Sequence, residues 1–136
     1  MLLRPNQPKF KKQRKGKLNR IETKAINLKF GYIGLKSHGH ARITARQIEA
    51  ARQTITRHIK RKGRVWIRIF PDVPISQKPT ETRMGKGKGA VNFWAARVSP
   101  GRILFEIEGV PTRIAVKALQ SGSRKLPILT KIIIKT

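Results

Sequence analysis

The chain has 136 residues, with 32 Lys and Arg residues against 6 Asp and Glu residues, so its formal net charge is +26. This charge excludes a free-standing cytosolic enzyme, because such a chain would repel itself when compact and attract every polyanion nearby. The absence of cysteine excludes disulfide scaffolds, thiolate zinc sites and cysteine nucleophiles, and the apolar runs are far shorter than the roughly 20 residues of a membrane span. A small basic binder of nucleic acid remains.

Residues 1–21 form a basic extension with eight cations and no anion. Its few apolar residues show no period, so we expect this segment to order only against an anionic surface. A mitochondrial presequence is also basic and poor in acids, but Pro5 and Pro8 disfavour the amphipathic helix that it needs. The candidate RNA contacts in this extension are Lys9, Lys11, Lys12, Arg14 and Lys15.

Residues 25–35 predict a strand, because Ile26, Leu28 and Phe30 alternate with polar residues. Gly31 and Gly34 then indicate a bulge or a turn. The clearest helix follows.

This helix is expected to begin at Thr44. Thr44 and Gln47 have the spacing of a capping box, in which the Thr hydroxyl and the Gln amide satisfy free backbone N–H groups. Gly63 supplies the stop, and residues 60–62 are expected in the last turn, where the helix dipole favours cations.

The helical period predicts one core face and one cationic face. The core face consists of Ile48, Ala51, Ile55 and Ile59. The opposite arc carries Arg46, Arg57, Lys60 and Arg61. These cations could simply keep the helix soluble, but Glu49 is the only acid among them, which favours contact with a polyanion.

Residues 64–70 alternate as a second strand, with Val65, Ile67 and Ile69 on one face. The other face carries Arg64, Trp66, Arg68 and Phe70. Trp and Arg on one face can stack on bases or riboses, and Arg64 and Arg68 are therefore candidate RNA contacts. Equally, this can be a second packed face that arginine stems cover.

Residues 77–90 form a loop in which glycine and lysine alternate. Its central residues are Arg83, Met84, Gly85, Lys86, Gly87, Lys88 and Gly89. The spacing fits neither phosphate-binding nucleotide motif, both of which open a helix. A thin backbone with ammonium groups can instead enter between crowded phosphate chains, where Cβ atoms would clash. The alternative is a mobile surface hairpin.

The remaining sequence predicts two strands, a helix and a closing strand. Residues 91–98 and 102–108 are expected to form an antiparallel hairpin around the turn at 99–101. A helix begins at Pro111, with its apolar stripe at Ile114, Ala115, Ala118 and Leu119, and is expected to fray at 121–123. Residues 127–136 read as the last strand. We expect one folded domain over residues 22–136, with no linker dividing it.

No arrangement of residues supports catalysis. His38 and His40 could lie on one side of a strand and bind a metal, but no third ligand is evident, and His58 is isolated. No Ser–His–acid set can be argued. We therefore expect no enzyme activity, no metal, no cofactor and no small-molecule substrate.

Several long motifs resemble one family. They are residues 44–52 (TARQIEAAR), 65–72 (VWIRIFPD), 78–79 (KP), 83–89 (RMGKGKG), 100–106 (PGRILFE), 109–111 (GVP) and 125–128 (KLPI). In this order they resemble the bacterial and organellar large-subunit ribosomal protein L-sixteen family, over essentially the whole chain. The departures are local, at residues 121–123 and 19–25.

The resemblance implies an α+β fold, with an antiparallel sheet, two helices and a hammerhead-like β element. It implies binding to large-subunit rRNA between the central protuberance and the peptidyl-transferase region, beside the aminoacyl-tRNA site, and a part in late subunit assembly. Residues 83–89 would then reach toward tRNA in the A and P sites, and residues 1–20 would thread among rRNA helices. Neighbouring large-subunit proteins would be further partners, and no membrane is implied.

The expected location is the ribosome. The composition, rich in Lys and Ile, favours the mitochondrial matrix over the plastid stroma or the bacterial cytoplasm. An RNA-processing enzyme or a free RNA chaperone is the alternative function. The scarcity of acids disfavours the enzyme, and the ordered pattern of strands and helices disfavours the chaperone.

Overall fold

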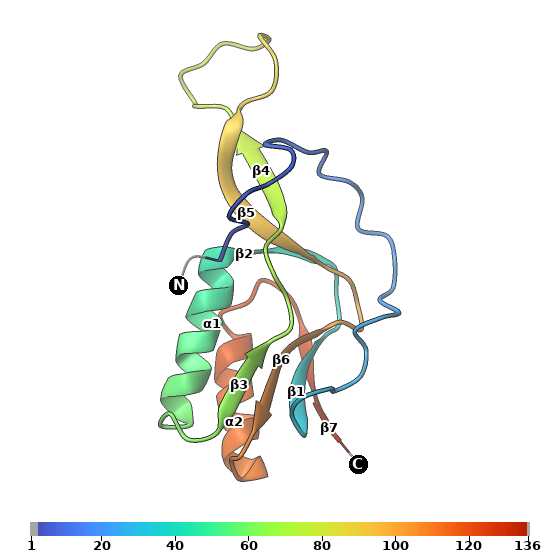
Figure 1. The fold of residues 1–136 in the computed structure, drawn as a ribbon, viewed down its shortest axis with the longest axis vertical. Coiled ribbons are helices and arrows are strands. Elements are labelled where there is room, and N and C mark those ends of the chain that lie inside the picture. The colour runs from blue at the N-terminus through green and yellow to red at the C-terminus, as the bar shows by residue number, and fades with distance from the viewer. Residues whose placement is uncertain (1–2, 136) are drawn as a thin grey trace.

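The computed structural model describes residues 3–135 and has an α+β architecture, as predicted. Two helices and two antiparallel sheets make up the body (Figure 1). In chain order the elements are β1 (Ile33–Ser37), β2 (Ala41–Thr44), α1 (Ala45–His58), β3 (Arg64–Ile67), β4 (Val73–Gln77), β5 (Ala90–Val98), β6 (Ile103–Glu108), α2 (Thr112–Ser123) and β7 (Thr130–Ile134).

The larger sheet has the strand order β3-β6-β1-β7, and the smaller one has the order β2-β5-β4. The main core lies between the larger sheet and the two helices, and includes Leu35, Phe105 and Leu119, all almost fully buried. Long β5 leads away from this body, and the loop between β4 and β5 forms the far end of the molecule (Figure 1). No helix within residues 3–135 is long and apolar enough to cross a membrane.

Helix α1 begins as predicted. The Thr44 hydroxyl accepts a hydrogen bond from the Gln47 backbone N–H at 3.2 Å, and the Gln47 side chain accepts one from the Thr44 N–H at 2.9 Å. The predicted core face is also confirmed, because Ile48, Ala51, Ile55 and Ile59 are all buried. The helix ends earlier than predicted, at His58, so residues 60–62 lie in the following turn.

That turn has an unusual backbone. Lys60 and Arg61 both have positive φ angles, at 53° and 61°. Their N–H groups donate to the carbonyls of Arg57 and Thr56, respectively, and these two hydrogen bonds satisfy carbonyl groups at the end of the helix. Residues 60–62, which were predicted in the last turn of α1, therefore follow the end of the helix.

Helix α2 begins after Pro111 and does not fray where fraying was predicted. It continues to Ser123, and Gly122 is buried against Ile55 of α1. A Cβ at position 122 would lie 2.6 Å from the Ile55 Cγ1, so the absence of a side chain lets the two helices approach. Close helix contact offsets the poor local propensity of this segment.

The predicted hairpin of residues 91–98 and 102–108 is wrong, although both segments are strands. β5 pairs with β2 and β4, whereas β6 pairs with β1 and β3, so the two strands belong to different sheets. The buried Ser37 at the end of β1 holds the connecting turn. Its hydroxyl donates to the Ser99 carbonyl at 2.6 Å and accepts from the Arg102 N–H at 3.2 Å.

The other strand predictions are shifted or incomplete. The strand predicted over residues 25–35 begins eight residues later, at Ile33, and is β1. The strand predicted over residues 64–70 is β3, which ends at Ile67. β2 and β4 were not predicted; β4 contains Pro74, which an edge strand tolerates. The closing strand lies within the predicted segment as β7, and Thr136 is outside the described residues.

Candidate nucleic-acid interface

Positive charge on this protein is largely free of internal partners. Among residues 3–135 three ion pairs occur, which join Arg52 to Glu49, Arg68 to Glu106 and Arg102 to Glu22. They use three of the six acidic residues and only three of the 32 Lys and Arg residues. Because the uncompensated cations are spread over the exposed surface, the protein has the electrostatic character of a polyanion binder.

The five predicted contacts in the basic extension, Lys9, Lys11, Lys12, Arg14 and Lys15, are all exposed. This extension has no helix or strand in residues 3–21, and it runs beside the β4–β5 hairpin (Figure 1).

Hydrogen bonds hold the extension against the hairpin and β2. The Lys12 ammonium donates to the Lys88 carbonyl at 3.0 Å, and the Lys88 ammonium donates to the Gln13 carbonyl. Farther along, Arg42 donates to the Gly16 carbonyl at 2.7 Å, and Arg97 approaches the Arg14 carbonyl at 3.4 Å. The extension and the glycine–lysine loop therefore form one continuous cationic surface.

The glycine–lysine loop projects from the end of β4 and β5 (Figure 1). Residues 80–88 are exposed, Met84 at 99%. Gly85, Lys86 and Gly87 have φ angles of 91°, 54° and 81°, so three successive residues adopt the left-handed conformation. Glycine at two of these positions removes the steric cost that an L side chain would carry. The Lys78 ammonium donates to the Gly85 carbonyl inside the loop.

A second group of cations lies at the opposite end of α1. Arg57, Arg61 and Arg64 are exposed there, around the turn that follows the helix. Arg46 is exposed at the start of α1, near the hairpin. Since a 14-residue helix is about 21 Å long, the predicted contacts form two separate groups on one molecule.

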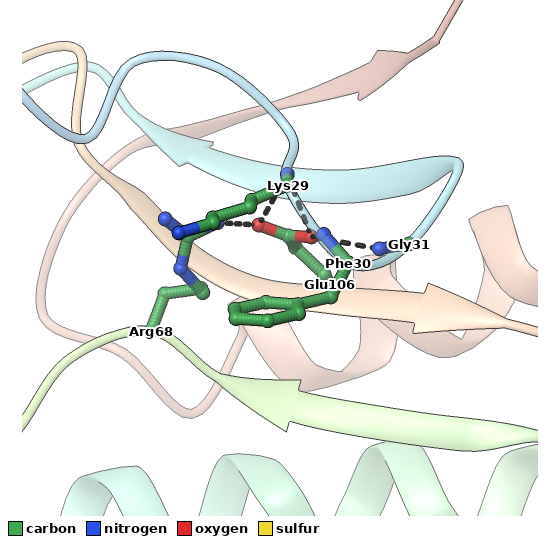
Figure 2. A network of polar contacts seen from close by, with 5 residues as sticks. All are labelled: Lys29, Phe30, Gly31, Arg68 and Glu106. Carbon is green, nitrogen blue, oxygen red and sulfur yellow. Dashed lines mark hydrogen bonds and ion pairs between the residues drawn. The ribbon is translucent and has the colours of Figure 1, made fainter.

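Arg68 differs from the other candidates because its guanidinium forms an ion pair within the protein. It forms an ion pair with Glu106, whose side chain is fully buried. The same carboxylate accepts backbone N–H groups from Lys29 at 3.2 Å, Phe30 at 2.7 Å and Gly31 at 2.8 Å (Figure 2). Burial alone would raise the pKa of Glu106, but these backbone bonds and Arg68 together lower it, so the group is a carboxylate.

Glu106 fastens a strap, residues 25–31, across the face of the larger sheet that the helices do not cover. The other end of the strap is held where the Ala25 carbonyl accepts the Ile103 N–H at 2.9 Å. Gly34 of β1 leaves room beneath Leu28, because a Cβ there would lie 2.5 Å from the Leu28 Cδ2. The apolar alternation that predicted a strand over residues 25–35 thus belongs to this strap and to β1.

The aromatic residues of this face are packed together. The Phe30 and Trp66 rings are stacked with centroids 5.9 Å apart, and the Arg68 guanidinium lies 5.2 Å from the Phe30 centroid. Of the two interpretations of the Trp–Arg face, the structure favours a second packed face for Trp66 and Arg68. Phe70 remains half exposed beyond the end of β3.

Sequence reasoning missed five residues that shape this surface. Arg42 and Arg97 hold the extension, and Arg102 pairs with Glu22. A signal for Glu106 was present, since it is a lone acid in the apolar run of residues 103–107. Within residues 3–135 no group of three or more His, Asp or Glu side chains is placed to hold a metal ion.

Comparisons with known proteins all match nearly the whole chain to one family. The family model described as "Ribosomal protein L16p/L10e" matches residues 5–133. A protein of Paracoccus denitrificans named "Large ribosomal subunit protein uL16" is 61% identical over 97% of this chain and 96% of its own length. Relatives of the same name from Parvibaculum lavamentivorans and Cereibacter sphaeroides are 60% and 57% identical over 97% and 98% of this chain, and 95% and 98% of their own lengths. These relatives are bacterial, so the expected preference for the mitochondrial matrix has no support from them.

Proposed function

We propose a function from the premise that this chain belongs to the ribosomal protein L16p/L10e family: it is a structural constituent of the large ribosomal subunit, acts in translation and is not an enzyme. The observation that carries this proposal is the match of the family model over residues 5–133, together with relatives about 60% identical over nearly the full chain. Its place of action is the ribosome, among large-subunit rRNA and neighbouring ribosomal proteins.

The protein binds large-subunit rRNA mainly by neutralising phosphates. The predicted cationic contacts of the extension and the loop support this, together with Arg46 and Arg57 of α1, because they are exposed and in no ion pair with other described residues. Lysine and arginine contacts to phosphate release condensed counterions and set register without reading sequence. Arg68 contributes indirectly, since its ion pair with Glu106 holds the strap in place.

The finer placement concerns tRNA. We place the loop of residues 83–89 toward the A site and the peptidyl-transferase region, where it helps to position tRNA, and the extension among rRNA helices. The support is the family resemblance together with the shape of the loop, which projects beyond both sheets and carries three successive left-handed residues. The same family resemblance supports incorporation late in subunit assembly.

Sedimentation tests the proposed function. The purified chain, mixed with large subunits of Paracoccus denitrificans that lack their own copy, is expected to sediment with them through moderate salt. Its affinity for free rRNA is expected to fall by roughly 10³ or more between 50 and 200 mM salt if about 10 phosphates are contacted. A chain that stays at the top of the gradient, or washes off as a free RNA chaperone would, refutes the proposal.

Two double variants test the division between binding and tRNA positioning. Lys86→Ala with Lys88→Ala removes two loop charges, and is expected to leave incorporation largely intact while slowing tRNA accommodation. Arg57→Glu with Arg61→Glu reverses two charges at the far end of α1, and is expected to weaken incorporation. Equal loss of incorporation from both pairs would contradict this division.

A further inference from the structure

A cavity of about 510 Å³ lies where the basic extension, the start of α1 and β5 meet. Arg4 lines it from the extension, Arg46 from the first turn of α1, and Asn92, Phe93 and Trp94 from β5. It is separate from the glycine–lysine loop and from the cations at the far end of α1. None of the predicted contacts except Arg46 belongs to it.

The residues around this cavity combine aromatic surface with uncompensated positive charge. Phe93 is 38% exposed, and Trp94 is half-buried. Arg4 and Arg46 are exposed and in no ion pair among residues 3–135, and α1 has no acidic residue in its first turn. The Asn92 side chain, which donates to Gln77 at 2.8 Å, adds a polar group at the edge.

We propose that this cavity binds one unstacked nucleotide of the large-subunit RNA, its base against Trp94 and its phosphate between Arg4 and Arg46. The site rests on the proposed function, because that function supplies the RNA. Proteins that recognise single-stranded RNA stack unpaired bases on aromatic side chains and bind the flanking phosphates with cations. The volume falls within the range of roughly 300–1,000 Å³ that is typical of small-molecule sites, enough for one nucleotide.

A protein partner would suit the cavity less well. Two arginines at its rim repel the other basic proteins of a ribosome, whereas they attract phosphate. A single indole, that of Trp94, also suits one base better than an apolar side-chain cluster.

Tryptophan fluorescence tests this proposal, because the chain contains only two tryptophans. In Trp66→Phe, Trp94 is the only reporter, and the remaining Phe can still stack on Phe30. Protein-free large-subunit RNA of Paracoccus denitrificans is added to this variant, and binding is followed separately by filter retention. Trp94 emission is expected to be quenched and protected from acrylamide, whereas Trp66 emission in the reciprocal Trp94→Phe variant is expected to change little.

A matched pair of variants measures the contribution to affinity. Trp94→Leu is expected to lower RNA affinity by roughly 5-fold or more, the lower end of what loss of one stacked base costs. Ile114→Ala removes an apolar side chain of α2 that is 44% exposed, and is expected to leave affinity unchanged. Arg46→Gln is likewise expected to weaken binding more than Arg113→Gln, which removes one charge from α2.

The outcomes separate this site from the function on which it rests. Retained RNA binding with unchanged Trp94 emission, or with equal losses in the matched pairs, overturns the nucleotide site and leaves the proposed function standing. Equal quenching of both tryptophans also overturns it, because that result reports a general change. Failure of the unmodified chain to bind RNA at all refutes the proposed function itself.

Discussion

Replacing Glu106 by Gln should destabilise the fold severely, although the two side chains have nearly the same shape. The substitution keeps the size of the side chain but removes the charge that holds three backbone N–H groups and pairs with Arg68 (Figure 2). An amide can accept at one end only, and its NH2 group then faces either an N–H donor or the guanidinium. The strap should therefore detach from β6 first.

The magnitude follows from the contacts. A hydrogen bond to a charged group contributes about 1.5–3 kcal/mol, against about 0.5–1.5 kcal/mol for a neutral one, so three weakened bonds lose about 3 kcal/mol. Arg68, 16% exposed, also loses its counterion, and breaking a buried pair typically costs about 3–5 kcal/mol. Because both losses arise from the same carboxylate, they are not additive. We expect Glu106→Gln to lower the free energy of unfolding by about 3–5 kcal/mol, a large part of the roughly 5–15 kcal/mol that a domain has.

Urea unfolding at neutral pH measures this loss, and hydrogen exchange locates it. The amides of residues 29–31 should lose protection in the variant before those of β6 do. Glu108→Gln is the matched control, because Glu108 lies on the same strand, is exposed and forms no ion pair among the described residues, so its effect should stay within about 0.5 kcal/mol. A loss below about 1 kcal/mol for Glu106→Gln, or equal effects of the two substitutions, would refute the reasoning.

The pH dependence gives an independent check on Glu106. The backbone hydrogen bonds and Arg68 outweigh burial and lower the pKa of the folded protein, so the unfolded chain binds the proton more readily. The stabilisation is fully present above the unfolded-state pKa of about 4.3 and is lost as the pH falls through the lower folded pKa. The stability gap between the natural chain and Glu106→Gln should thus be constant near neutral pH and narrow below about pH 4.3.

Three further substitutions test local features of the fold by thermal or urea unfolding. Gly122→Ala should destabilise by about 1–3 kcal/mol despite the better helix propensity of alanine, because the new Cβ would lie 2.6 Å from the buried Ile55 Cγ1; a stabilised variant would contradict this. Thr44→Ala should lower the free energy of unfolding by about 1 kcal/mol, because it removes the side-chain cap of α1. Thr44→Ser keeps the hydroxyl and should keep most of that stability, so equal losses from the two substitutions would argue against the cap. Phe30→Ala should cost about 0.5–1.5 kcal/mol beyond its lost apolar area, and pairing it with Trp66→Ala should give a non-additive sum; additivity would show that the rings do not interact.

Local patterns in the sequence predicted the helices better than the strands. The start of α1 and its core face depend on residues three or four apart, so Thr44, Gln47 and Ile48 were sufficient to identify them. The strap depends on a carboxylate 75 residues away from Gly31, and no local pattern can reveal that. The alternation in residues 25–35 was real, but its first part packs across a sheet instead of joining it.

The partition of strands between the sheets was likewise a long-range property. A short turn between two strands normally gives a hairpin, but Ser37 binds both sides of this turn and directs β6 to a different sheet from β5. For the candidate interface, composition predicted the sign of the charge and the exposure of the loop. It could not predict that Arg68 is engaged by Glu106, or that Arg46 lies beside Trp94 at a cavity.

The way in which the basic extension is attached affects how its sequence can evolve. Gln13, Arg14 and Gly16 are held through their carbonyl oxygens, which every amino acid possesses. Substitutions in the extension can therefore change the side chains that face solvent without removing these carbonyl hydrogen bonds. Two positions are exceptions. Lys12 is held through its own ammonium group, which donates to the Lys88 carbonyl. Gly16 has a φ of 68° and lies close to Arg97, and both features select against a side chain. The outward side chains of the extension are therefore free to change while the path of its main chain stays the same.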